Sequence, residues 1–287
     1  SIDGGWPKET PPAAQDGGFE SYPERIDANK IRQRSESFSD HFSQATLFFN
    51  SMSEHEKEHI IAAYSFELGK VEREFIRARE VNEILANIDL ELAKRVAANL
   101  GLPAPTKGTV EARKTSFDHS PALSQANLLP ENIKTRKVAI LAANGVDGAA
   151  IDAMKKALAA EGAHAKLLGP TSAPVKTADG KSLPVDASME GMPSVIFDAV
   201  FVPGGAASIK ALSGDGVALH YVLEAYKHLK AIALHGEAKQ LLDVLKLEAD
   251  AGWLEGKDVG AWTKPFFAAR GQHRVWAREP KAKAVPA

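Results

Sequence analysis

The chain has 287 residues, a formal net charge of −2 and no cysteine, and 44% of its residues are hydrophobic. This length allows two domains with ordinary cores, and the balanced charge excludes an extended basic face of the kind that binds nucleic acid. The lack of cysteine excludes disulfides, thiolate metal sites and a cysteine nucleophile. No apolar run approaches the roughly 20 residues of a membrane span, so we expect no membrane partner either.

Residues 1–52 are predicted to form an extended arm. The chain begins at Ser1 without an initiator Met, which indicates a processed product or an excised fragment. Residues 1–50 are rich in Pro, Gly and charge and show neither a helical nor a strand period. A floppy tail would carry few aromatics, so we expect an arm that wraps a partner or another part of the protein. The large apolar side chains of this arm are Trp6, Phe19, Tyr22, Ile26, Ile31, Phe38 and Phe42.

Residues 53–101 are predicted to be a small helical domain. Ser53 and Glu56 have the spacing of a capping box, Asp89 can cap a later helix, and Gly101 can end it. Between them runs an apolar stripe at helical spacing, made of Ile60, Tyr64, Leu68, Val71 and Phe75. Residues 102–134, rich in Pro, Ser and Thr with little period, are predicted to be a linker.

Residues 135–287 alternate strand and helix patterns. Continuous apolar runs predict buried strands at 136–143, 164–169, 198–205 and 231–234, and a hairpin is expected around Asp179-Gly180. Helices are predicted after the first strand, ended by Gly162, and over 217–229. This alternation predicts an α/β fold of flavodoxin-like type, a parallel sheet with helices on both faces.

The sharpest motif is HEKEH at residues 55–59, which has the spacing of a zinc-metalloprotease helix. His55 and His59 would hold the metal and Glu56 would act as the base. The motif occupies the first turn of a helix with charged neighbours, and no third ligand is evident. We therefore favour an exposed helix start over a zinc site.

Two turns of the α/β region could carry chemistry. Gly204-Gly205 opens a helix whose N–H groups could hold an anion, but a lone Gly-Gly more often marks a tight turn. Residues 230–245 form a strand, a turn at Gly236 and a helix, the outline of a nucleophile elbow. The crest carries Leu234 and His235, so a base at His235, with Asp147 to assist it, would have no nucleophile. A small-molecule hydrolase or amidotransferase-like enzyme stays open as an alternative.

The remaining histidines are dispersed and predict no metal site. His220 and His228 share one side of a predicted helix, which is more often a surface placement than a ligand pair. The others are His41, His119, His164 and His273. We therefore assign no catalytic, cofactor-binding or metal-binding residue to this chain.

Several segments together resemble the C-terminal portion of the large-subunit haem catalases. The stretches GGFESYPERIDANKIRQRSESFSDHF, HIIAAYSFELGKVEREFIRARE, DAVFVPGG and HRVWAREPKAKAVPA carry the resemblance, which runs over nearly the whole chain. Within HEKEH, only His59 fits a position where the family is expected to have histidine. The resemblance implies a wrapping arm, a helical domain and a type 1 glutamine amidotransferase-like, flavodoxin-like domain. Reactive members of that fold carry cysteine at about the position of Leu234.

The resemblance also implies function. The parent protein would decompose hydrogen peroxide with haem, and the haem site would lie upstream of Ser1. The four tyrosines, Tyr22, Tyr64, Tyr221 and Tyr226, do not match the haem-ligand motif, so no haem is expected in this chain. The expected partners are the catalase β-barrel core and sister subunits of a homotetramer. A chaperone-like module that captures unfolded clients on its exposed aromatics is a further alternative.

Overall fold

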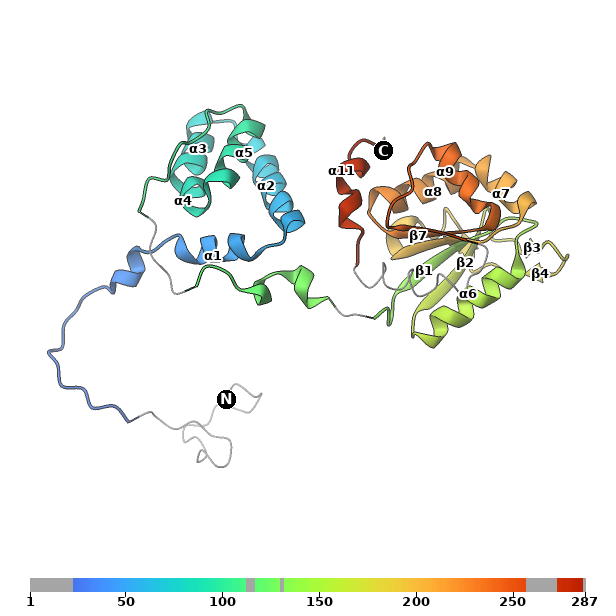
Figure 1. Ribbon diagram of the computed structural model, residues 1–287, viewed down its shortest axis with the longest axis horizontal. Helices are drawn as coiled ribbons and strands as arrows, with labels where there is room; N and C mark the ends of the chain where they lie inside the picture. Colours follow the sequence, from blue (N-terminus) through green and yellow to red (C-terminus); the bar gives the residue numbers. More distant parts are fainter. Residues whose placement is uncertain (1–22, 112–116, 130–131, 257–272, 286–287) are drawn as a thin grey trace.

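The structure is a computed structural model that describes residues 23–111, 117–129, 132–256 and 273–285. A helical part, residues 43–102, is followed by a linker and an α/β part, residues 133–285 (Figure 1). Trp6, Phe19 and Tyr22 of the predicted arm lie outside the described residues. No helix in the described ranges is long and apolar enough to cross a membrane.

The helical part packs short helices around one apolar core. Phe49, Ile61, Leu85, Leu92 and Val96 are buried in it, and Tyr64 packs against it. Its helices are α1 (Ser43–Ser51), α2 (Glu54–Gly69), α3 (Glu74–Arg79), the π-helical η3 (Glu80–Leu85), α4 (Ala86–Ile88) and α5 (Leu90–Leu100), preceded by the 3₁₀ turn η2 (Glu36–Ser39).

The predicted helix signals are confirmed. Ser53 and Glu56 form the capping box of α2. The side chain of Asp89 accepts a hydrogen bond from the N–H of Leu92 at 2.7 Å and so caps α5. Gly101 ends α5 in the left-handed conformation, with φ +69°. Each device satisfies backbone groups that a helix end leaves unpaired.

Two predictions for this region are wrong. Residues 43–51 are helical, because the buried Phe49 and the hydrogen bond from Thr46 Oγ1 to the carbonyl of Ile88 hold this segment on the helical core. The predicted continuous stripe also breaks, because α2 ends at Gly69. Phe75 consequently lies on α3, where it is 65% exposed.

The α/β part is built on a six-stranded sheet in which all pairs are parallel. The strand order is β5-β2-β1-β6-β7-β8. Apart from the short β5, this is the 2-1-3-4-5 order of flavodoxin-like folds. The strands are β1 (Lys137–Leu141), β2 (His164–Gly169), β5 (Ala187–Ser188), β6 (Ala199–Val202), β7 (Ala231–His235) and β8 (Trp253–Gly256).

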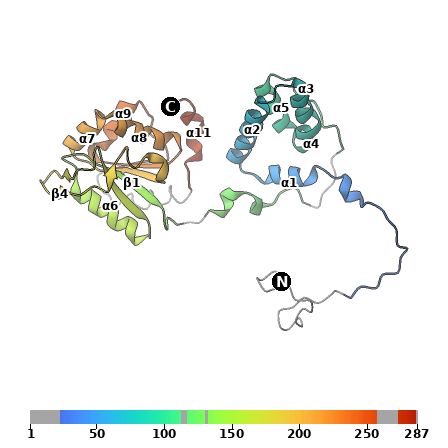
Figure 2. The ribbon, with the colours of Figure 1, turned by 180° about the vertical axis from the view of Figure 1, so that it is seen from behind.

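Helices cover both faces of the sheet, as predicted (Figures 1 and 2). Val138 and Ile140 of β1 face the core shared with α6, whereas Ala139 and Leu141 face the core shared with α7, α8 and α9. Successive strand residues point to opposite faces, so a strand covered on both sides must be apolar throughout. The helices are α6 (Gly148–Ala160), α7 (Ala206–Ser213), α8 (Gly216–Lys227) and α9 (Gln240–Leu245).

The predicted hairpin is confirmed as β3 (Val175–Lys176) paired antiparallel with β4 (Ser182–Leu183). Gly180 in its turn has φ +87°. The edge strands β5 and β8 were not predicted. The linker, predicted without regular structure, contains the 3₁₀ turns η4 (Pro121–Leu123) and η5 (Gln125–Leu128).

A C-terminal segment, residues 273–285, packs back on the sheet edge through η8 (Trp276–Arg278) and α11 (Glu279–Ala282). Arg278 anchors it, with a side chain that is 0% exposed. Its guanidinium donates to both carboxylate oxygens of Asp250 at 2.8 and 2.9 Å and to the carbonyl of Lys230 at 2.8 Å. This fixes the direction in which α11 leaves the α/β part.

Candidate functional site

The elbow lies at the carboxyl edge of the sheet, where β1, β6 and β7 end. The helical connection after β1 runs to β2 and the one after β6 runs in the opposite direction to β7, which makes the gap between β1 and β6 a topological switch point. Ligands of open α/β folds bind at such a point. Asp147 follows β1, Gly204 and Gly205 follow β6, and His235 ends β7, so the fold brings the predicted elbow residues together.

The structure corrects the predicted position of the crest from Leu234 and His235 to Gly236, because the left-handed turn, with φ +58°, lies there. A Cβ added there would lie 3.8 Å from the Cα of Gly204, an ordinary contact, so the position is open but carries no side chain. Leu234, which the resemblance places where reactive members have cysteine, is 0% exposed and packs in the core under α8 and α9. Neither residue supplies a nucleophile.

The groups around the crest are held by the backbone. Nδ1 of His235 accepts a hydrogen bond from the N–H of Gly204 at 3.3 Å and lies 3.7 Å from Oδ2 of Asp147. Glu237, which the sequence analysis did not single out, accepts from the N–H of Gly205 at 3.1 Å. These two N–H groups are thereby engaged by side chains, which supports the interpretation of Gly204-Gly205 as a tight turn.

An open pocket of about 490 Å³ adjoins this edge. Asp147, Asp152, Asp179 and Glu237 bring carboxylates to it and Lys181 brings one ammonium. The hydroxyl group of Thr177, which also lines the pocket, forms hydrogen bonds within the hairpin. It donates to the carboxylate of Asp179 and accepts from the N–H of Lys181 at 2.9 Å. The hydroxyl therefore serves the β3–β4 turn, and the hydrogen bonds from Thr177 and Lys181 lower the pKa of Asp179 to about 2, which makes this carboxylate a weak base.

The HEKEH motif forms a structural junction. The ring of His55 stacks on that of Trp276, with centroids 4.4 Å apart and planes 9° apart. Nε2 of His59 lies 3.0 Å from both carboxylate oxygens of Glu279. Burial lowers the pKa of His55, against the opposing effect of the Glu56 carboxylate. Among the described residues, no group of three His, Cys, Asp or Glu side chains could hold a metal ion.

Glu56 is a cap and not a base. Its carboxylate accepts from the N–H and the hydroxyl of Ser53, both at 2.8 Å, from the hydroxyl of Ser124 at 2.7 Å and from the N–H of Gln125 at 3.0 Å. Burial alone raises its pKa, but the hydrogen bonds from Ser124 and Ser53 outweigh burial and lower it to about 2. A carboxylate this acidic is a poor acceptor of a proton from water.

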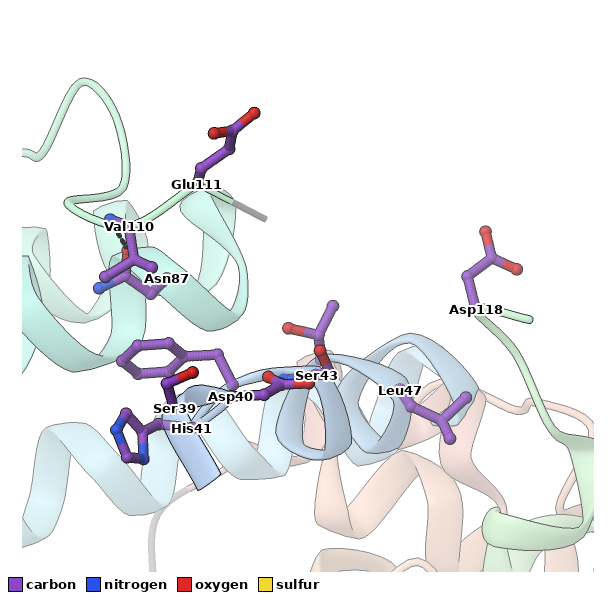
Figure 3. Close-up of a pocket in the computed structure, with 11 residues that line it drawn as sticks. Ser39, Asp40, His41, Ser43, Leu47, Asn87, Val110, Glu111 and Asp118 are labelled. Carbon is purple, nitrogen blue, oxygen red and sulfur yellow. Dashed lines mark hydrogen bonds between the residues drawn. The ribbon is translucent and has the colours of Figure 1, made fainter. Parts of the chain in front are cut away.

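A second pocket, of about 380 Å³, lies beside α1 in the helical part (Figure 3). Asp40, Glu111 and Asp118 line it, but their carboxylates do not converge. Oδ1 of Asp40 accepts from the N–H of Ser43 at 3.0 Å. Asn87 accepts from the N–H groups of Thr109 and Val110. These polar groups hold the surrounding backbone in place.

His220, His228 and the described tyrosines lie on the surface or pack in the cores. His220 on α8 and His228, which caps the C-terminus of α8, are exposed, as predicted, and His228 pairs with Glu224 of α8 at 3.2 Å. Tyr64 packs on the helical core, and Tyr221 donates to the carbonyl of Met192 at 3.0 Å, with a pKa raised by burial. Tyr226 packs against Arg278.

Comparison with known proteins agrees with these observations. Two family models match the chain: "Catalase-related immune-responsive" over residues 35–100 and "C-terminal domain found in long catalases" over residues 134–280. A catalase HPII from Pseudomonas putida is 64% identical over 288 residues, which cover 100% of this chain and 40% of the relative. Catalase-B from Dictyostelium discoideum is 45% identical, with coverage of 100% and 42%.

Catalase-2 from Bacillus subtilis is 37% identical over 94% of this chain and 38% of its own length. The chain thus spans about two fifths of the curated relatives that it matches. The comparisons support neither the chaperone-like alternative nor the hydrolase alternative. Because the second model covers the α/β part and more than half of the sequence, the chain belongs to the family of C-terminal domains found in long catalases.

Proposed function

We propose that this chain is the C-terminal region of a large-subunit catalase that decomposes hydrogen peroxide, and that it contributes structure to the enzyme. The observation that carries the proposal is the match of the whole chain to only 40% of a catalase HPII. A structural role also agrees with the elbow at Gly236, which has no nucleophilic side chain. The division into an arm, a helical domain, a linker (102–134) and a flavodoxin-like domain (135–287) is part of the proposal, with the helical domain extended to include α1 (Ser43–Ser51).

Exposed apolar side chains support a covered position within the parent enzyme. Ile26, Ile31 and Phe38 of the arm are 83%, 71% and 65% exposed, and Phe66 on α2 is 66% exposed. An extended segment that exposes large apolar side chains along its length is typical of an arm that lies on another protein surface. We propose that the β-barrel core and sister subunits of a homotetramer cover them, and that the parent's haem lies in that core.

The activity test compares the isolated chain with its parent. Purified chain, with and without added haem, should release no more oxygen from peroxide than free haem does, while the parent is fully active. The intact parent subunit should weigh more than twice the 30.7 kDa of this chain. Haem-saturable peroxide breakdown by the isolated chain would refute the proposal.

The contact test uses Phe66→Ser. In the isolated chain this change should leave the thermal midpoint nearly unchanged, because the side chain is exposed. In the parent it should lower the midpoint or the assembled fraction, because a buried phenyl ring contributes roughly 1.5–3 kcal/mol. The isolated chain is the matched control. An equal effect in both proteins would contradict the proposed cover.

A further inference from the structure

The first turn of α2 joins three segments that are far apart in the sequence. Glu56 holds the linker through Ser124 and Gln125. On the same turn, His55 and His59 contact the C-terminal segment, 220 residues beyond His59. α11 stands on the side of the α/β part that faces the helical part (Figures 1 and 2). The histidines therefore touch a segment that belongs to the other part.

The C-terminal segment that carries Glu279 is fixed to the α/β part. Arg278 is fully buried between Asp250 and the sheet edge, the N–H of Val275 donates to the carbonyl of Leu229 at 2.8 Å, and Ala282 is 4% exposed. Glu279 directly follows Arg278. Because α11 is fixed to the α/β part, a weaker contact between Glu279 and His59 would let the whole α/β part move relative to α2.

Several charged groups surround the contact between His59 and Glu279. Glu279 offers His59 a carboxylate, and a competing ammonium, that of Lys283, lies 3.9 Å from Glu279. On α2 itself, Glu58 is held by both guanidinium nitrogens of Arg95 at 2.6 Å, so its charge is largely balanced. The titratable and charged groups that face His59 are His55, Glu56 and Glu58 from α2, Arg95 from α5, and Glu279 and Lys283 from α11.

We propose that His59 and Glu279, with the His55–Trp276 stack beside them, form a pH-dependent clasp that sets how the helical part lies against the α/β part. A neutral imidazole can still donate to Glu279, but an imidazolium adds a full charge to the same hydrogen bond. The clasp is therefore stronger when His59 is protonated and weaker when it is neutral. The inference is independent of the catalase proposal.

The test measures the distance between the two parts in the full chain. Because the chain has no cysteine, Glu91→Cys on α5 and Lys156→Cys on α6 provide two unique spin-label sites at exposed positions. Between pH 6 and pH 8 the ratio of open to closed distances should rise about two- to fivefold, the range expected for a partly exposed ion pair. His59→Gln keeps a donor but cannot be protonated, so it should abolish the pH response.

Glu279→Gln should abolish the response to the same extent, and the double variant should behave like either single variant. His220→Gln, an exposed histidine on α8, is the matched control and should keep the full response. A distance that does not change with pH in the unaltered chain would overturn the proposal. So would a pH response that survives in His59→Gln or Glu279→Gln.

Discussion

Replacing Arg278 with methionine tests how the C-terminal segment is held. The guanidinium of Arg278 makes two hydrogen bonds to Asp250 and one to the carbonyl of Lys230, all at 2.8–2.9 Å. It also lies 4.6 Å from the ring centroid of Tyr226 and 5.7 Å from that of Trp253. Methionine keeps part of the aliphatic packing but removes the charge and every donor.

The expected loss is large because Asp250 would keep its charge without its partner. Removing one member of a buried ion pair costs about 3–5 kcal/mol. The side chain of Asp250 is 15% exposed, so water can reach it in part, and we expect about 3 kcal/mol. Removing both charges, with Arg278→Met and Asp250→Leu together, should bring the free energy of unfolding back to within about 1–2 kcal/mol of the unaltered chain.

Urea unfolding followed by circular dichroism and tryptophan fluorescence measures both variants. Lys281→Met is the control, because the pair of Lys281 with Glu248 at 3.0 Å is exposed and should contribute no more than about 0.5 kcal/mol. The reasoning fails if Arg278→Met costs less than about 1 kcal/mol, or if the double variant loses the sum of the two single losses.

Three further changes probe other parts of the structure. An added Cβ at Gly205, where φ is +114°, would lie 2.2 Å from the carbonyl oxygen of Gly145, so Gly205→Ala should cost at least about 2 kcal/mol in thermal unfolding. Gly214→Ala, with its nearest atom at 3.7 Å, should cost less than about 0.5 kcal/mol, and equal losses would contradict the argument. Gly252→Ala would push the guanidinium of Arg278 off its partner and cost about 1–3 kcal/mol, a penalty that should shrink in the Arg278→Met background if the clash is real. Because the folded pKa of Glu56 is about 2, below its ordinary 4.5, Glu56→Gln should cost at least about 1 kcal/mol at pH 7, and this cost should decline as the pH falls from about 4.5 through 2, so a pH-independent loss would refute this origin.

Local signals explain which parts of the fold could be predicted from the sequence. The central strands are covered on both faces and therefore appear as unbroken apolar runs, as in residues 137–141. The edge strand β8 is four residues long and ends in glycine, so it has no such run. α1 was missed because its hold on the core comes from Thr46 and Phe49, contacts that a local period does not reveal.

The candidate sites divide in the same way. The sequence predicts the turn at Gly236 and the lack of a nucleophile, since both follow from residue types next to one another. It could not predict that Glu237 would bond the N–H of Gly205, or that Glu279 would meet His59, because long-range packing makes these contacts. The capping of α2 by Glu56 was predicted, but its grip on the linker was not.

Arg278 and Glu279 are adjacent, but their side chains make contacts in opposite directions. Arg278 binds Asp250 at the sheet edge, and Glu279 binds His59 on α2. These two adjacent residues therefore connect the edge of the sheet to α2, more than two hundred residues earlier in the sequence. Damage to the sheet edge would loosen both ends of this coupling together. A disturbed sheet edge should consequently also shift the balance between the open and closed arrangements of the two parts.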